Sequence, residues 1–277
     1  MSHPTELNEA KHLRALNDFF RAHASQYCLN ESSDSDALRA HFATLEEVDL
    51  SDCELTELPE EIRLLTNLKH LQLECNALST LPDTIGQLTS LRELDLWENQ
   101  FKDLPDSIGD LTSLRALDLS DNRFKTVPAC IWRLEQLEEL DLSSDKLTEL
   151  SEQIRHLIQL AELDAFGNKL SSLPSMLCLL PNLRELDVSD NKLKTLPAQF
   201  ATLTTLTSLD ISDNKIGQLP AGMDQWTKLT YFDGRDNPMV TLPPNLKRLQ
   251  TKTKQQSWIW WSILFIGFIF IAAELLW

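Results

Sequence analysis

The sequence is poor in glycine, and its cysteines show no paired spacing. Glycine occurs 7 times among 277 residues, so no glycine-rich loop is present that could cradle a phosphate. The cysteines are Cys28, Cys53, Cys75, Cys130 and Cys178. An odd number without regular spacing indicates reduced thiols rather than a disulfide framework. The N-terminal segment has no apolar stretch, and we therefore expect no secretory signal peptide.

The sequence also lacks the motifs of common catalytic sites. The six histidines show no His-Glu-x-x-His spacing and do not cluster with cysteines as a zinc set. No nucleophile elbow is present. His70 is expected to be a solvated side chain. We predict that the protein is not an enzyme and has no metal, no cofactor and no small-molecule substrate.

Basic residues are much less frequent than acidic residues. The chain has 25 Lys and Arg against 42 Asp and Glu, which gives a formal net charge of -17. Nucleic-acid binding needs clustered Lys and Arg to neutralise phosphates, so nucleic acid is not an expected partner. An acidic surface attracts basic proteins and accelerates their encounter.

The dominant feature is an internal repeat of 23 residues. Nine units run from residue 45 to 251, and the third is LRELDLWENQFKDLPDSIGDLTS, from Leu91 to Ser113. Seven positions of every unit are apolar, and Gly234 is the sole exception. Such a register over nine units predicts a repeat architecture in which each unit buries its apolar side chains against its neighbours.

The spacing inside the unit predicts its local structure. Leu94 and Leu96 alternate with polar residues, which is typical of a short strand with one buried face. Asn99 follows, and its amide can bond the backbone of a turn that no ladder satisfies. Ile108 and Leu111 are three residues apart, as on one turn of a helix. We predict an α/β solenoid with a concave parallel sheet and short helices on the convex side.

The unit resembles that of the leucine-rich-repeat family, most closely the intracellular Ras-group type with its L-P-x-x-I-x-x-L segment. This resemblance covers about three quarters of the chain. It implies a protein-binding solenoid. Bacterial leucine-rich-repeat ubiquitin ligases and kinase-linked relatives add a catalytic domain, whereas 26 residues follow the last unit here. The chain departs from the pattern at Cys53 and Asp145 (turn asparagine), Ser151 (proline), and Phe232 and Gly234 (strand).

Residues 1–44 lie outside the repeat. Apolar residues at helical spacing (Leu13, Leu16, Phe20 and Tyr27) predict a first amphipathic helix. A polar break separates it from a second short helix over 37–44, with Ser35 or Asp34 as its N-cap. We expect a helical cap over the open end of the first unit. A separate docking helix is the alternative.

The C-terminal segment has the composition of a membrane anchor. A basic neck over 252–257 precedes an apolar segment over 258–277. Its predicted interface residues are Lys247, Arg248, Lys252, Lys254, Trp258, Trp260 and Trp261. Twenty helical residues span about 30 Å, roughly the thickness of the hydrocarbon core. We predict a single-pass C-terminal anchor with the repeats in the cytoplasm. An interfacial or oligomerising helix and a buried core helix are the alternatives.

The central outward-facing strand position is acidic in eight of nine units. Its residues are Asp49, Gln72, Asp95, Asp118, Asp141, Asp164, Asp187, Asp210 and Asp233. Neighbouring strands lie about 4.8 Å apart, so these carboxyl groups form a column, which we call the aspartate column. Aspartate at this position also resembles the general family pattern. Three roles remain open: solubility, binding of a Lys- and Arg-rich protein, and calcium binding, although single carboxylates suit calcium poorly.

The same face carries further acidic residues and three large aromatics. Two residues before the column lie Glu47, Glu93, Glu139, Glu162 and Glu185. Trp97 and Phe166 stand where most units have serine, and Tyr231 lies on the other flank. Exposed aromatics in an acidic field are candidate anchors for a partner. We predict a membrane-anchored protein-interaction module or scaffold; a structural spacer that oligomerises through its membrane helix is the alternative.

Overall fold

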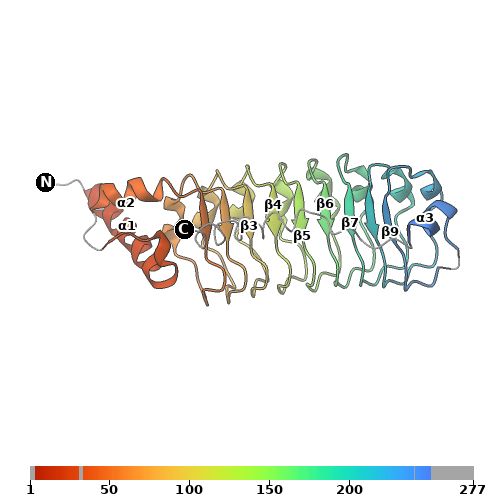
Figure 1. Ribbon diagram of the computed structural model, residues 1–277, viewed down its shortest axis with the longest axis horizontal. Helices are drawn as coiled ribbons and strands as arrows, with labels where there is room; N and C mark the ends of the chain where they lie inside the picture. Colours follow the sequence, from red (N-terminus) through yellow and green to blue (C-terminus); the bar gives the residue numbers. More distant parts are fainter. Residues whose placement is uncertain (1–3, 31–33, 240, 251–277) are drawn as a thin grey trace, which may run out of the picture.

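The nine repeats form a single parallel sheet. The computed structural model describes residues 4–30, 34–239 and 241–250. The strands pair in sequence order, one strand per repeat. They are β1 (Glu47–Asp49), β2 (His70–Gln72), β3 (Glu93–Asp95), β4 (Ala116–Asp118), β5 (Glu139–Asp141), β6 (Glu162–Asp164), β7 (Glu185–Asp187), β8 (Ser208–Asp210) and β9 (Tyr231–Asp233). Figure 1 shows them side by side along an elongated molecule.

Equivalent leucines lie one over another, as the repeat predicts. Leu94 is in register with Leu71 on one side and with Leu117 on the other, and Leu117 is in register with Leu140. These side chains are almost completely buried, and the apolar core is continuous from the N-terminal helices to the last repeat. The predicted leucine-rich solenoid with a parallel sheet is confirmed.

The segments that return behind the sheet form short 3₁₀ helices. They are η2 (Glu60–Leu64), η3 (Asp83–Gln87), η4 (Asp106–Asp110), η5 (Ala129–Arg133), η6 (Glu152–His156), η7 (Ser175–Leu179), η8 (Ala198–Thr202) and η9 (Met223–Gln225). Proline precedes most of them in an extended conformation, as Pro105 does before η4. In the fifth repeat Ser151 takes this place, and its hydroxyl accepts a hydrogen bond from the Gln153 amide.

The turn asparagines connect adjacent repeats through their side-chain amides. Asn99 Oδ1 accepts from the Leu78 amide at 3.0 Å, and its Nδ2 donates to the Leu73 carbonyl at 2.9 Å. Equivalent bonds recur along the chain, for example at Asn191, which contacts the backbone of Leu170 and Ala165. The amides thus satisfy backbone groups at the point where strand pairing ends.

The first turn contains Glu54 with a positive φ, and every turn shares one further position of this kind. It directly precedes the asparagine position, with φ between 47° and 68°, and the residues are Asp52, Cys75, Glu98, Asp121, Ser144, Gly167, Asp190, Asp213 and Asp236. Aspartate tolerates this left-handed region better than most residues, and glycine adopts it without strain. Backbone geometry therefore explains the preference for aspartate and glycine at this position.

Two helices cover the first repeat. They are α1 (Pro4–His23) and α2 (Ser35–Phe42), with the short η1 (Ser25–Tyr27) between them. Asp34 caps α2 by accepting from the Ala37 amide at 2.8 Å. Leu13, Phe20 and Phe42 are fully buried in the common core. These helices therefore close the N-terminal end of the solenoid, as the cap interpretation expects.

The last repeat differs from the others because its return segment is α-helical. Helix α3 (Pro244–Leu249) buries Leu246 and Leu249 and lies opposite the α1–α2 end in Figure 1. The neck over 252–257 and the anchor over 258–277 lie outside the described residues, so both stay predictions. Among the helices that are described, none has the length and hydropathy of a membrane span.

Candidate protein-binding face

The aspartate column has a structural role that the sequence pattern did not reveal. In each of its eight aspartates, Oδ1 accepts a hydrogen bond from the backbone amide two residues later, at 2.6–3.0 Å. These amides begin the turn, where strand pairing stops. A short carboxylate reaches its own chain in this way and forms an Asx turn. Part of the column therefore serves the backbone, whichever partner the face binds.

The column is less exposed than the sequence suggested. Asp118, Asp141, Asp210 and Asp233 are buried, and Asp49 is exposed. Burial raises the pKa of Asp95 to about 8, with a further contribution from repulsion by Asp118. It also raises the pKa of Asp118 to about 6 and that of Asp141 well above its ordinary value. Burial beside like charges therefore favours the neutral form of these three carboxyl groups in the middle of the column.

The glutamate row beside the column is also engaged with its surroundings. Glu93 forms an ion pair with His70 at 2.8 Å, which raises the His70 pKa, so His70 is not the freely solvated residue that we expected. Burial raises the pKa of Glu139 to about 7, assisted by repulsion from Glu93 and Glu138. Glu162 and Glu185 occupy the equivalent positions of β6 and β7.

Trp97 and Phe166 are the exposed aromatics of this face. These residues directly follow strands and are 40% and 42% exposed, whereas the large apolar residues of the strands are buried except for Tyr231, which is half-buried. Each follows its column aspartate by two residues and donates its backbone amide to that aspartate, Asp95 or Asp164. The third and sixth repeats are three strands apart, so the two rings are separated by about 14 Å.

Tyr231 occupies a different environment from the other two aromatics. Its side chain is half-buried on β9, and its hydroxyl donates to Asp210 Oδ2 at 3.0 Å. Burial and the charge of Asp210 raise the pKa of Tyr231 above its ordinary value. Because the hydroxyl is committed to Asp210 within the sheet, Tyr231 is less suited to anchor a partner than Trp97 or Phe166.

The predicted membrane-interface residues fall in two places. Lys247 and Arg248 belong to α3, the return helix of the ninth repeat. Lys252, Lys254, Trp258, Trp260 and Trp261 lie outside the described residues. The first two basic residues are therefore part of the folded end of the solenoid and not of a separate neck.

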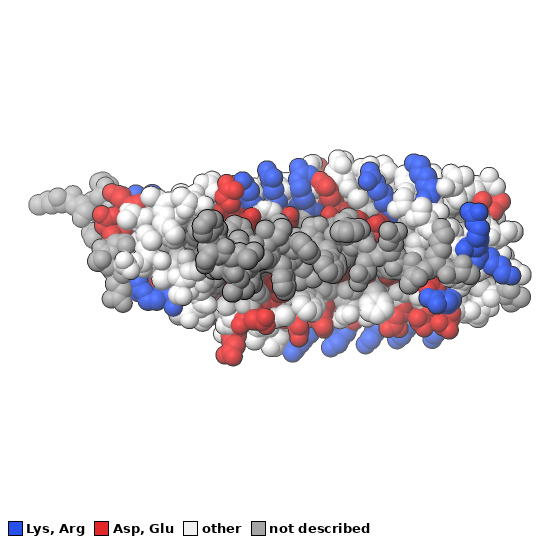
Figure 2. All heavy atoms as spheres, in the orientation of Figure 1, with Lys and Arg blue, Asp and Glu red and all other residues white. Residues whose placement is uncertain are grey.

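Basic residues line the long edges of the molecule, a feature that the sequence analysis did not single out. Figure 2 shows Lys and Arg side chains in rows above and below the middle of the viewed face, with Asp and Glu between them. In five successive repeats the residue after the turn asparagine or Asp145 is basic and exposed: Arg123, Lys146, Lys169, Lys192 and Lys215. A comparison of the residues that directly follow the turn asparagine in successive repeats would have revealed this row from the sequence.

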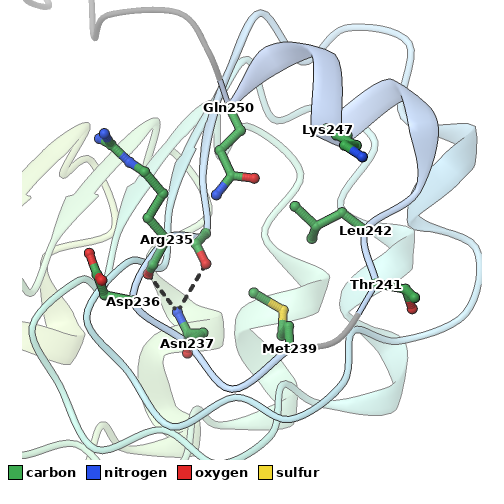
Figure 3. A pocket seen from close by; sticks show the side chains of 9 residues that line it. Arg235, Asp236, Asn237, Met239, Thr241, Leu242, Lys247 and Gln250 are labelled. Atoms are coloured by element: carbon green, nitrogen blue, oxygen red, sulfur yellow. Dashed lines mark hydrogen bonds between the residues drawn. The ribbon is translucent and has the colours of Figure 1, made fainter.

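A pocket of about 390 Å³ opens at the C-terminal end of the solenoid. Figure 3 shows it between the ninth turn and α3, lined by Gly234, Asn237, Met239, Leu242, Lys247 and Gln250 among others. Asn237 Nδ2 donates to the Arg235 carbonyl at 3.2 Å and contacts that of Gly234 at 3.4 Å. The pocket lies apart from Trp97 and Phe166, and of the predicted site residues Lys247 alone lines it.

The described residues offer no site with the donors that a metal ion requires. Within 4–30, 34–239 and 241–250, no three His, Cys, Asp or Glu side chains converge closely enough to hold one. The column supplies one carboxyl group per strand, and one oxygen of each already accepts from the backbone. This geometry suits contact with cationic side chains spread along a partner better than a single divalent cation.

Comparison with known families agrees with this geometry. Three family models match consecutive parts of the chain: "Leucine rich repeat" over 43–101, "Leucine-rich repeat region" over 84–189, and "Leucine Rich repeats (2 copies)" over 181–231. Together they cover most of the sheet. The chain is a leucine-rich-repeat protein. No curated protein sequence matches it.

Solved structures of similar shape come from bacteria and plants. A leucine-rich-repeat protein of Leptospira interrogans is 32% identical over 79% of this chain and 61% of its own, with a TM-score of 0.67. The ectodomain of the Arabidopsis thaliana receptor kinase GASSHO1/SCHENGEN3, solved with Casparian strip integrity factor 2, is 28% identical over 73% of this chain and 26% of its own, with a TM-score of 0.64. The functional domain of InlJ from Listeria monocytogenes is 26% identical over 74% of this chain and 47% of its own, with a TM-score of 0.60. This chain thus spans less than two thirds of each.

Proposed function

We propose that this leucine-rich-repeat protein is a non-catalytic binding module that recognises a protein partner on its concave face. The observation that carries the proposal is the exposure of Trp97 and Phe166 on a face that otherwise presents small polar and acidic side chains. Large aromatics left half-exposed in the middle of a protein surface are the residue types that dominate binding energies at interfaces. The plant relative is itself a repeat domain solved with a bound factor.

The partner that fits this face has a basic surface with an apolar patch. Carboxyl groups of the aspartate column and of the glutamate row lie between the two aromatics. Lys and Arg of a partner would pair with the ionised carboxyl groups and would favour loss of the proton from Asp95 and Glu139, whose pKa values are raised to about 8 and about 7 in the unbound protein. Electrostatic attraction of this kind accelerates association and weakens as salt is added.

The composition of the C-terminal segment supports a second part of the proposal, which concerns where in the cell the protein is located. Sixteen uncharged residues begin at Trp258, include three tryptophans near their start and follow Lys252 and Lys254, which is the composition of a tail anchor. We propose that residues 258–277 hold the repeats at the cytoplasmic face of a membrane as a signalling scaffold. Removing 258–277 is expected to move the protein from the membrane fraction to the soluble fraction; retention at the membrane would contradict the anchor.

The binding face is tested with a pair of matched variants. Trp97→Ala combined with Phe166→Ala removes the two exposed rings of the concave face. Ile158→Ala combined with Leu179→Ala removes two apolar side chains that are 46% and 64% exposed outside the strands. Proximity labelling and pull-down with the full-length chain would identify a partner and compare the variants.

The expected result is loss of the partner with the aromatic pair and retention with the control pair. Each anchor is expected to contribute about 1–2 kcal/mol, so the double variant should weaken binding at least tenfold. Asp118→Asn combined with Asp141→Asn keeps an oxygen for the Ser120 and Ser143 amides and removes the two charges, and it should weaken capture of a basic partner. If both tests capture the same partners as the parent protein, the proposal that the concave face binds the partner is refuted. Homo-oligomers that require residues 258–277 in membrane crosslinking would instead favour the spacer role.

A further inference from the structure

The fifth turn carries a carboxyl group where seven other repeats carry an amide. Asp145 replaces the turn asparagine, which the other repeats supply as Asn76, Asn99, Asn122, Asn168, Asn191, Asn214 and Asn237. Asp145 is 5% exposed, as buried as the five asparagines of the third, fourth, sixth, seventh and eighth repeats. A buried carboxyl group in the same backbone environment as seven amides differs from them mainly in its ability to gain or lose a proton.

The neighbouring amide shows which bonds the position requires. Asn122 Oδ1 accepts from the Phe101 amide at 2.9 Å. Its Nδ2 donates to the carbonyls of Leu96 and Leu119 at 2.8 and 3.0 Å. One end of the side chain must therefore accept, and the other end must donate into a group of carbonyl oxygens.

Asp145 fulfils the first requirement, but its second carboxyl oxygen has no hydrogen-bond partner among the described residues. Oδ1 accepts from the Phe124 amide at 2.9 Å, as an asparagine would. Oδ2 is buried and has no hydrogen-bond partner among the described residues. The register of the repeat places the carbonyls of Leu119, Leu142 and Ser143 where an amide nitrogen would donate. An ionised Oδ2 would face these oxygens with like partial charge and no donor.

We propose that the fifth turn holds Asp145 as a neutral carboxylic acid, whose Oδ2–H donates to this group of carbonyls, and that loss of the proton to solvent loosens the joint between the fourth and fifth repeats. The joint comprises the turns over 119–124 and 142–147. It lies between the repeats that carry Trp97 and Phe166, but the inference does not depend on the proposed function.

The electrostatic surroundings agree with this assignment. Burial raises the pKa of Asp145 to about 7, and the negative charge of Asp121 in the preceding turn acts in the same direction. Lys146, next in sequence, opposes the shift weakly. The hydrogen bonds that Asp145 accepts from the backbone of Phe124 and Asn122 also oppose the shift. The charged neighbours thus leave burial as the dominant cause.

The direction of the pH effect follows from linkage. In the unfolded chain Asp145 titrates near pH 4, whereas the folded protein retains its proton up to about pH 7. Between these values folding takes up one proton at this site, so the unfolding equilibrium constant increases about tenfold per pH unit on this account. Above the folded pKa the effect levels off. The joint is therefore strongest in mild acid and weakest above neutral pH.

The test compares the full-length protein with its Asp145→Asn variant in urea unfolding from pH 4 to pH 8.5. Other titrating carboxyl groups are common to both proteins and cancel in the comparison. The variant should match the parent near pH 4, and its advantage should grow about tenfold in equilibrium constant per pH unit until about pH 7. An advantage that does not change with pH, or a less stable variant at pH 8, would overturn the proposal.

Two further measurements locate the effect. Hydrogen exchange of the Phe124 amide should be faster in the parent than in Asp145→Asn at pH 8 and equal near pH 4. The matched variant Asn168→Asp should create a second pH-sensitive turn, seen at the Leu147 amide, which bonds Asn168 at 2.9 Å. In difference infrared spectra at pH 6, the parent should show the carbonyl stretch of a protonated carboxyl group that Asp145→Asn lacks. Its absence would exclude the neutral acid.

Discussion

The ring of Phe232 lies over Gly234, so one large side chain fills the space that two leucines share in other repeats. A Cβ atom added to Gly234 would lie 2.8 Å from Phe232 Cζ and 3.1 Å from Met239 Cε. Phe232 is fully buried. The two departures of the ninth repeat from the leucine pattern therefore compensate each other: an oversized residue in β9 requires an empty neighbour.

This compensation predicts a strong coupling between the two positions. Gly234→Leu alone should lower the free energy of unfolding by about 1–3 kcal/mol, because the added side chain overlaps the Phe232 ring. Adding Phe232→Leu should recover most of the loss by restoring the two leucines of the other repeats. Urea unfolding of the two single variants and the double variant measures the coupling energy. Additive effects would show that the ring does not occupy the space over Gly234.

A second prediction concerns the left-handed backbone of the sixth turn. Gly167 has a φ of +68°, and an added Cβ would meet its nearest neighbours in Ser144 at an ordinary 3.5 Å. Gly167→Ala should therefore lower the free energy of unfolding by about 1 kcal/mol through backbone strain alone. Gly217→Ala is the matched control, since its Cβ meets nothing within 4 Å, and it should change stability by less than about 0.5 kcal/mol. Equal losses in both variants would contradict the strain argument.

The sequence was sufficient to predict the fold because the periodicity directly reflects packing. Leu94 and Leu117 are 23 residues apart, and they lie in register on adjacent strands. The apolar residues at helical spacing before residue 45 likewise identified the buried face of α1. The role of the turn asparagine was also predictable. One amide per repeat stands where strand pairing must end, and backbone N–H and C=O groups there need hydrogen-bond partners.

The candidate site was predictable in position but not in environment. The sequence places Asp118 and Asp141 in one column, yet it does not report that both are buried or that each accepts from its own chain two residues later. Those properties depend on the conformation of each turn and on neighbouring side chains. The ion pair of His70 with Glu93 also joins residues 23 positions apart. Sequence spacing alone does not show whether such a histidine pairs with the glutamate or is solvated.

A third prediction concerns the edge of the sheet under the N-terminal cap. The Tyr27 hydroxyl accepts a hydrogen bond from the Asp49 amide of β1 at 3.0 Å, on a strand whose only partner in the sheet is β2. Tyr27→Phe keeps the ring, which packs against Phe20 at 5.6 Å. The variant should lose about 0.5–1.5 kcal/mol of stability, and the Asp49 amide should exchange faster. Unchanged exchange would mean that the hydroxyl does not protect this edge.

A fourth prediction follows from the raised pKa of Glu139. Burial and repulsion from Glu93 raise this pKa from 4.5 to about 7, so the folded protein holds a proton that the unfolded chain loses above about pH 4.5. The stability contributed by this site should therefore fall as pH rises from about 4.5 to 7. Glu139→Gln removes the titration and should stabilise the protein by about 1–2 kcal/mol at pH 8, after allowance for solvent screening, with little effect at pH 4.

The adjacent Glu138 provides the control for this prediction. It forms an exposed ion pair with Arg115. Glu138→Gln removes one partner of this ion pair and should cost up to about 1 kcal/mol at pH 8, which is the opposite sign to Glu139→Gln. Urea unfolding of both variants at the two pH values separates the cases. If both substitutions destabilise the protein at pH 8, Glu139 is ionised and paired in the folded state, and the acidic face is more strongly charged than its burial implies.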